Sequence, residues 1–274
     1  MIRNSLLNRI DQARLIRTYR RTLGHQSSGA MAGGLIVSLT SFPARINQAW
    51  VSIESILRQR VRPELIVLCL CESEFGNRHD LPEEIKTQTK LGLEIIWVQQ
   101  RLRSYGKLIP ARQAYPAATI ITVDDDIIYP EEMIADLLEE HQQAPAAITG
   151  RRGYTMIRDA GQTFAPYTSW PQATAQTPSE TCLLTGVGGI LYPPSSLATE
   201  SSHDLELIHA LCPTADDIWF WAMSRLAGDQ RRCLGQHQVR EIKRLIKTPR
   251  LSKTNVSRGG NDRQLSRVVD YFQL

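Results

Sequence analysis

Three consecutive aspartates, Asp124, Asp125 and Asp126, follow a run of β-branched residues. Two unit charges about 4 Å apart repel by roughly 4 kcal/mol at an effective dielectric of about 20, so such crowding calls for a cation, a hydrogen-bonded loop or exposure to water. Mg²⁺ is typically held by one or two carboxylates together with substrate phosphate oxygens and waters. An acidic β-turn is the structural alternative. The triplet therefore indicates a divalent metal and a phosphorylated substrate.

A second acidic pair, Asp216 and Asp217, lies about ninety residues further along and precedes an apolar stretch with Trp219 and Trp221. One aspartate at this place is explained as the cap of a helix, where it compensates the helix dipole. Two adjacent aspartates leave a spare carboxylate. A base that deprotonates a hydroxyl nucleophile would need such a group, so we expect a catalytic role for this pair.

Two further motifs lie near these acids in chain order. Gly188 and Gly189 belong to a glycine-rich turn that leads into a strand at 186–194. Such glycines form a bulge or let the backbone approach a ligand such as a sugar ring closely. Lys107 precedes a helix, where its ammonium is either solvated or placed near a pyrophosphate.

The order of apolar segments predicts alternating strands and helices up to residue 150. Parallel βαβ units with right-handed crossovers follow from this alternation. Ligands collect beyond the carboxyl ends of the strands in such open sheets, and the aspartate triplet lies at that edge. The loop-rich segment 151–185, with Tyr154 and Tyr167, is a candidate acceptor-binding wall. The strands are expected at 35–39, 65–71, 93–98, 118–123 and 146–149, and helices at 44–60, 105–114, 130–142 and 216–226, with a short one opening at 81–84.

The chain has 274 residues, of which 42% are hydrophobic and 22% charged, as in an ordinary globular protein. No apolar stretch approaches the ~20 residues needed to cross a bilayer, and no signal peptide is recognisable near Met1. We therefore expect a cytoplasmic protein. Its five scattered cysteines lack zinc-type spacing and are expected to be reduced, buried thiols.

Both ends of the chain are basic. Residues 1–26 carry six arginines against one acid, and residues 229–274 carry eleven Lys and Arg against four acids. No nucleic-acid module appears, so an anionic membrane surface is the expected partner of these ends, and the inner membrane a candidate site of peripheral attachment. A helix expected at 2–23 lies on such a surface or packs on the main domain or on a partner. Residues 24–34 are expected to form a linker, and the stretches 253–255 and 259–262 to be loop-like.

Five motifs recur in the same order in bacterial surface-polysaccharide glycosyltransferases, which this chain resembles over residues 34–228. The resemblance is to the large family-2 type and implies an α/β, GT-A (Rossmann-like) fold with a mostly parallel sheet flanked by helices. The expected division is a basic helix and linker at 1–33, the GT-A domain at 34–228 and a basic extension at 229–274. The motifs are residues 40–43, 104–107, 123–126, 186–194 and 215–219.

The resemblance also implies roles for individual residues. Asp126 would hold Mg²⁺ or Mn²⁺, with Asp124 as a candidate second ligand. Asp124 or Asp125 would otherwise contact the ribose, the sugar or a metal-bound water. Asp217 matches the catalytic base and Asp216 lies beside it, although the family pattern often has Glu-Asp there. The residues implied in donor binding are Thr40, Pro43, Arg45, Lys107, Asp124, Asp125, Gly188 and Gly189.

The function implied is the inverting transfer of a sugar from a nucleotide-diphosphate donor, with a UDP-sugar expected, to a hydroxyl of a saccharide or lipid-linked acceptor. Surface polysaccharide synthesis, in lipopolysaccharide or capsule, is the setting. One alternative is a sugar-1-phosphate nucleotidyltransferase, but residues 39–45 lack the glycine-rich, basic loop that those enzymes carry after the first strand. The other is a catalytically silent scaffold of a polysaccharide-assembly complex, docking by its basic ends.

Overall fold

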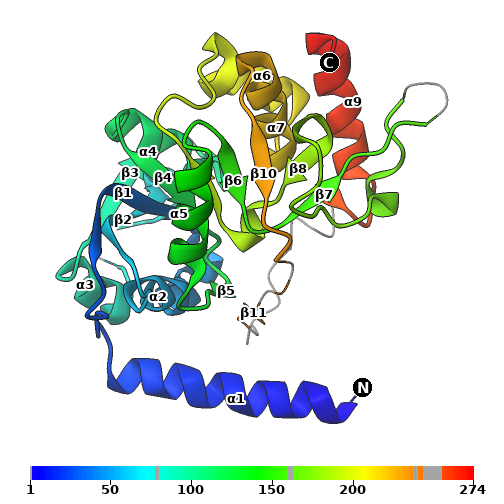
Figure 1. The fold of residues 1–274 in the computed structure, drawn as a ribbon. Coiled ribbons are helices and arrows are strands. Elements are labelled where there is room, and N and C mark those ends of the chain that lie inside the picture. The colour runs from blue at the N-terminus through cyan, green and yellow to red at the C-terminus, as the bar shows by residue number, and fades with distance from the viewer. Residues whose placement is uncertain (1, 78–79, 160–162, 237, 239, 243–254) are drawn as a thin grey trace.

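A computed structural model of the chain describes residues 2–77, 80–159, 163–236, 238, 240–242 and 255–274. It contains a seven-stranded sheet in the order β10-β6-β9-β4-β1-β2-β3 (Figure 1). All pairings in this sheet are parallel except those of β9, which runs antiparallel to β4 and β6. The strands are β1 Met31–Thr40, β2 Arg62–Cys71, β3 Leu93–Val98, β4 Thr119–Thr122, β6 Ile148–Gly150, β9 Ile190–Tyr192 and β10 Arg231–Cys233.

Helices cover both faces of the sheet, which explains why its central strands are apolar without alternation. One apolar cluster joins the sheet to α2 Pro43–Leu57, α3 Glu83–Thr89 and α5 Met133–Gln143. The other cluster joins it to α4 Ile109–Ala114, α6 Leu205–Leu211, α7 Asp216–Ala227 and α9 Gly260–Phe272. The expected α/β architecture with a mostly parallel sheet is confirmed.

The helix expected at 105–114 is divided in two. A 3₁₀ turn, η2 Arg103–Lys107, precedes α4, and Pro110 falls in the first turn of α4, where its missing N–H costs nothing. Lys107 is therefore the last residue of the 3₁₀ turn, and α4 begins two residues later.

Short strands also pair outside the central sheet. β5 Ile127–Ile128 pairs with β11 Arg240–Glu241, and β7 Gly153–Thr155 pairs with β8 Cys182–Leu184. All five cysteines are buried and free, as expected. The remaining elements are the 3₁₀ turns η1 Glu72–Glu74, η3 Tyr167–Ser169, η4 Ser179–Thr181, η5 Gly186–Gly188 and η6 Glu200–His203.

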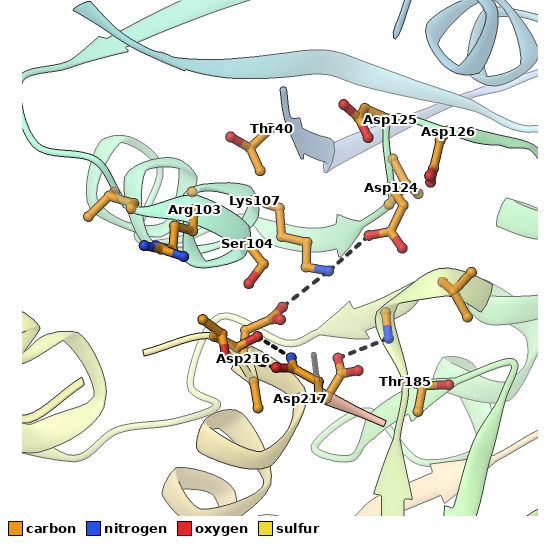
Figure 2. A pocket seen from close by; sticks show the side chains of 18 of the residues that line it. Thr40, Arg103, Ser104, Lys107, Asp124, Asp125, Asp126, Thr185, Asp216 and Asp217 are labelled. Carbon is orange, nitrogen blue, oxygen red and sulfur yellow. Dashed lines mark hydrogen bonds and ion pairs between the residues drawn. The ribbon is translucent and has the colours of Figure 1, made fainter. Parts of the chain in front are cut away.

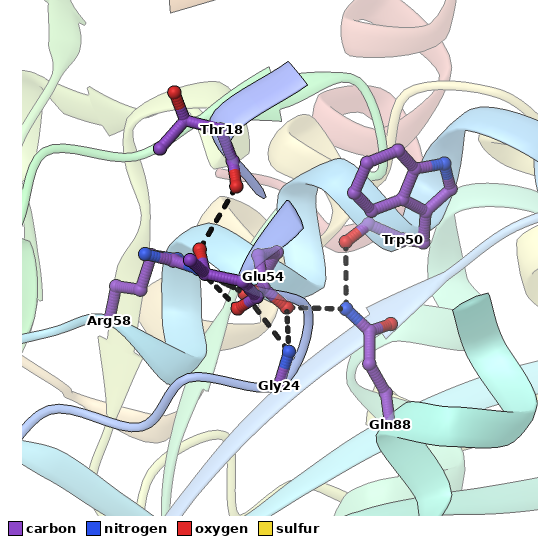
Figure 3. A network of polar contacts seen from close by, with 7 residues as sticks. Thr18, Gly24, Trp50, Glu54, Arg58 and Gln88 are labelled. Carbon is purple, nitrogen blue, oxygen red and sulfur yellow. Dashed lines mark hydrogen bonds and ion pairs between the residues drawn. The ribbon is translucent and has the colours of Figure 1, made fainter. Parts of the chain in front are cut away.

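The N-terminal helix, α1 Ile2–Arg21, extends away from the sheet beside α2 and α3 (Figure 1). Its C-terminal end is attached to α2: Tyr19 is buried, with the guanidinium of Arg58 4.6 Å from its ring centre. The buried carboxylate of Glu54 accepts hydrogen bonds from Arg58, the Gly24 N–H and Gln88 (Figure 3). No helix in the described part of the chain is long and apolar enough to cross a membrane.

Residues 24–34 are less linker-like than expected, because β1 begins at Met31 and the Ala30 carbonyl accepts from the Arg62 N–H. The C-terminal part also differs. β10 is an edge strand of the central sheet, and residues 259–262, expected to be a loop, begin helix α9. Leu265 and Val268 of α9 are buried in the core. Residues 253 and 254 lie outside the described residues.

Candidate active site

A cavity of about 640 Å³ opens at the carboxyl ends of β1 to β4. In parallel sheets this edge is where ligands bind, so the location agrees with the sequence-based expectation. The structure brings the two acidic motifs together here, on opposite sides of the Lys107 ammonium (Figure 2). The residues named from the sequence that line the cavity are Thr40, Arg45, Lys107, Asp124, Asp125, Asp126, Asp216 and Asp217.

Three residues expected in donor binding are not part of the cavity lining. Pro43 lies in the first turn of α2, where proline is favoured. Gly189 has a φ of +92° and packs against Met133. Gly188 packs against Arg152, because a Cβ at Gly188 would lie 2.9 Å from the Arg152 Cβ. Gly186 of the same turn lines the cavity instead.

Asp125 is the most enclosed member of the aspartate triplet. Its carboxylate accepts a hydrogen bond from the Ser41 hydroxyl (2.7 Å) and pairs with the Arg45 guanidinium (2.7 Å). Burial raises the pKa of Asp125 to about 6, while Arg45 opposes the rise. The side chain is 4% exposed, so we interpret Asp125 as a group that fixes Arg45 rather than one that contacts a ligand.

The other two aspartates face the cavity more openly. The side chains of Asp124 and Asp126 are 28% and 20% exposed. The Asp126 carboxylate lies 3.4 Å from Arg45, and the Asp124 N–H donates to the Tyr129 hydroxyl (2.8 Å). The described residues hold no group of three or more His, Cys, Asp and Glu that could bind a metal ion. One or two carboxylates plus substrate phosphates suffice for Mg²⁺, so Asp126 and Asp124 fit a metal that a diphosphate helps to hold.

Lys107 lies between the two acidic motifs. Its ammonium is 2.9 Å from Asp124 and 3.1 Å from Asp216. Burial alone would lower the pKa of Lys107, but the charges of Asp124, Asp216 and Asp217 outweigh this and raise the pKa well above its usual value. Lys107 therefore stays protonated and joins the triplet to the start of α7.

Asp217 has the properties of a general base. It lies in the first turn of α7, yet neither it nor Asp216 is the N-cap, which is Ala215. The Gly186 N–H donates to the Asp217 carboxylate (3.0 Å). Burial and the neighbouring charge of Asp216 raise the pKa of Asp217 to about 7, against the opposing charge of Lys107. A base whose pKa is near the working pH transfers protons efficiently.

Gly186 favours this arrangement because a side chain here would displace the Lys107 ammonium from its present position. A Cβ at this position would lie 2.5 Å from the Lys107 nitrogen and 3.4 Å from an Asp217 oxygen. The backbone therefore approaches the two charged groups as closely as only glycine allows.

Sequence reasoning found part of the opposite wall of the cavity. Tyr154 and Tyr167 of the expected acceptor wall line the cavity, whereas Trp170 is buried in the core. Arg152 and Thr185, which also line the cavity, lie in the same expected wall at 151–185, and Ser104 lies in the motif 104–107. Sequence reasoning missed Arg103, Asn255 and Asn261, among other lining residues. Arg103, with φ +52°, has a backbone conformation that is rare for a residue other than glycine and that clusters at ligand sites. No local pattern in the sequence marks Arg103, Asn255 or Asn261 as lining residues.

Comparison with known proteins gives a likeness in fold. No family model and no curated protein matches the sequence. The crystal structure of S. aureus TarS 1–349 in complex with UDP-GlcNAc has a TM-score of 0.51 and 14% identity, covering 80% of this chain and 60% of that chain. The crystal structures of TarS 1–349 without a named ligand and with UDP have TM-scores of 0.49 and 0.47 at 13% and 11% identity, covering 75% of this chain and 59% of that chain in both cases.

This chain therefore spans about 60% of the length of the TarS fragment. The similarity at 14% identity is one of fold and confirms the GT-A architecture expected from the order of the motifs.

Proposed function

We propose that the protein is a nucleotide-sugar-dependent glycosyltransferase that moves a sugar from a nucleotide-diphosphate donor, a UDP-sugar, to a hydroxyl of a saccharide or lipid-linked acceptor. The observation that carries this proposal is the single cavity in which Asp217, with a pKa of about 7, lies across Lys107 from Asp124. The fold shared with TarS, which has been solved with UDP-GlcNAc and with UDP, supports the choice of donor.

The donor occupies the side of the cavity formed by the carboxyl ends of β1 and β4. Thr40 and Arg45 contact the nucleotide there, and Asp125 keeps the Arg45 guanidinium in place through its 2.7 Å ion pair. The donor diphosphate lies beside Asp126 and Asp124. A Mg²⁺ or Mn²⁺ ion held by these two carboxylates would neutralise charge on the departing diphosphate.

The acceptor hydroxyl lies at Asp217 and transfer proceeds by direct displacement with inversion. Asp217 takes the hydroxyl proton as the oxygen forms its bond to the anomeric carbon. The bond from that carbon to the diphosphate breaks, and its electron pair leaves with the nucleotide. The Gly186 N–H holds the Asp217 carboxylate in place by a hydrogen bond, and Lys107 holds the neighbouring Asp216 by an ion pair.

A donor-hydrolysis screen tests this proposal. The full chain is incubated with common nucleotide sugars, with and without Mn²⁺, and released nucleotide is measured, while UDP binding is followed by calorimetry. We expect metal-stimulated release from at least one UDP-sugar and saturable UDP binding. A chain that neither binds UDP with Mn²⁺ nor releases it would be a non-catalytic component of an assembly, and the proposal would be wrong.

A further inference from the structure

Arg152 is a cation of the cavity that pairs with no carboxylate among the described residues, whereas Arg45 and Lys107 are both ion-paired. Its Nη2 donates to the Tyr154 hydroxyl (2.9 Å), and its guanidinium lies 5.6 Å from the centre of that ring. Its Nε is buried without a hydrogen-bond partner, and its Nη1 donates to no group of the described residues. A half-buried guanidinium with unused donors is costly unless a ligand satisfies it.

Arg152 lies close to the proposed base. The Gly186–Gly188 turn contacts both groups: a Cβ at Gly186 would lie 3.4 Å from Asp217, and a Cβ at Gly188 2.9 Å from the Arg152 Cβ. Both charges act on the phenol of Tyr167. Burial and the charge of Asp217 raise the pKa of Tyr167, and the charge of Arg152 opposes the rise. Arg152 and Asp217 therefore border the same glycine turn and the same tyrosine in the cavity.

The C-terminal segment closes the same side of the cavity. Asn261, at the start of α9, is 7% exposed and lines the cavity, and its carboxamide makes no hydrogen bond within the described residues. The Tyr167 N–H donates to the Asp262 carboxylate (2.6 Å), which fixes the start of α9 to the aromatic wall. Asn255 donates to the Thr214 carbonyl (2.7 Å), just before α7.

We propose that Arg152, Tyr154, Tyr167 and Asn261 form an acceptor subsite for a sugar that carries an anionic group, a phosphate or a carboxylate, near the hydroxyl that Asp217 deprotonates. The inference rests on the proposed function and adds the class of acceptor. Guanidinium groups bind both anions through two parallel hydrogen bonds. The tyrosine rings offer apolar faces to the sugar, and the Asn261 carboxamide donates to its oxygens.

The charge of this subsite provides selectivity. A neutral acceptor would leave the Arg152 donors without partners. A site built to hydrogen-bond one group of a ligand discriminates against ligands that lack that group. Asp216 and Asp217 repel the anionic group, so the sugar is oriented with its hydroxyl, and not its anionic group, toward the base.

The test is a calorimetric titration of the full chain saturated with UDP and Mn²⁺, so that the donor side is filled. Glucose 6-phosphate, glucuronate, glucose and inorganic phosphate are the probes. We expect one or both anionic sugars to bind at least about tenfold more tightly than glucose, as one charge-assisted pair provides. Whichever of the two binds identifies the anionic group as phosphate or carboxylate. Binding of inorganic phosphate as tight as that of glucose 6-phosphate would mean that the sugar makes no contact and would overturn the subsite.

Variants assign the effect to Arg152. Arg152→Gln should lose the preference for the anionic sugar, and Arg152→Lys should recover part of it, since the charge remains without the two-pronged geometry. Arg225→Gln, which removes an exposed arginine of α7 outside the cavity lining, is the matched control and should keep the preference.

UDP binding and the melting temperature of each variant report on folding and on the donor side. Equal affinities for glucose and both anionic sugars in a chain that binds UDP would overturn the subsite alone. Failure to bind UDP would instead contradict the proposed function.

Discussion

The charged side chains on the two sides of the cavity differ in how they are paired. On the donor side, Asp125 and Arg45 pair at 2.7 Å, and Lys107 lies between Asp124 and Asp216. On the acceptor side, Arg152 pairs with no described carboxylate, and the Asp217 carboxylate accepts from a backbone N–H. Fixed charges orient a nucleotide without reorganisation, whereas charges left available can take up a proton or an anion. The comparison assigns nucleotide binding to the donor side, and acceptor binding with proton transfer to the acceptor side.

Loss of the Asp217 carboxylate should have the largest effect on catalysis. Because general-base assistance contributes about 10²–10⁴ in rate, Asp217→Asn should lower kcat by about that factor. UDP affinity, measured by calorimetry, should stay nearly unchanged because the donor side is intact. Full activity in this variant would place the base elsewhere or indicate a retaining mechanism.

The buried pair of the donor side should matter most for stability. Arg45→Met leaves the Asp125 carboxylate buried without its cation, which should cost about 3 kcal/mol at pH 8. Asp125 has a pKa of about 6 with Arg45 present and a higher one without it, so at pH 5 it is protonated and the loss should shrink. Urea unfolding at both pH values measures this. An equal loss at the two pH values would show that the pair is not the cause.

Asp126→Ala should weaken donor binding rather than proton transfer. Removing one of the two carboxylates that fit a metal should raise the Kd of UDP by about 10–100-fold in Mn²⁺, on the scale of one lost charge-assisted contact. The effect without Mn²⁺ should be smaller, because the carboxylate then only repels the diphosphate. A Kd that is unaffected in Mn²⁺ would remove Asp126 from the metal site.

The pH dependence of kcat/KM should follow Asp217. Its pKa is about 7, so the active carboxylate form predominates at pH 8 and falls to about a tenth at pH 6. We expect transfer to fall about tenfold between these values, and the slope to be absent in Asp217→Asn. A flat profile in the wild-type chain would contradict the assignment of Asp217 as the base.

The same substitution should also change thermal stability. Because folding raises the pKa of Asp217 from 3.8 to about 7, its charge destabilises the folded chain increasingly as the pH rises from 4 to 7. Asp217→Asn removes this cost. The Tm at pH 8 should rise by about 2–4 °C for each kcal/mol by which the free energy of unfolding increases. Near pH 4 the gain should vanish. A lower Tm at pH 8 would mean that the carboxylate stabilises the site.

The sequence predicted the donor side better than the acceptor side. Continuous apolar strands and the acids after them are local patterns, so β1 to β4, Asp124–Asp126 and Asp217 could be found without coordinates. The hydrogen bond and the ion pair of Asp125 could not, because Ser41 and Arg45 are about eighty residues from Asp125 in the chain.

The acceptor side depends on contacts over longer separations. Tyr167 and Asp262 are 95 residues apart in the chain, and no short-range periodicity records such a contact. The glycines at 259 and 260 were interpreted as a loop, although Gly259 is the N-cap of α9 with φ +65°. An N-cap tolerates glycine, so composition alone did not distinguish a helix start from a loop.

A crystal structure of the full chain with a UDP-sugar and Mn²⁺ tests the central claim most directly. We predict that the diphosphate lies beside Asp126 and Asp124 and that the anomeric carbon faces the Asp217 carboxylate. A donor bound outside the cavity, or an anomeric carbon turned away from Asp217, would contradict the account.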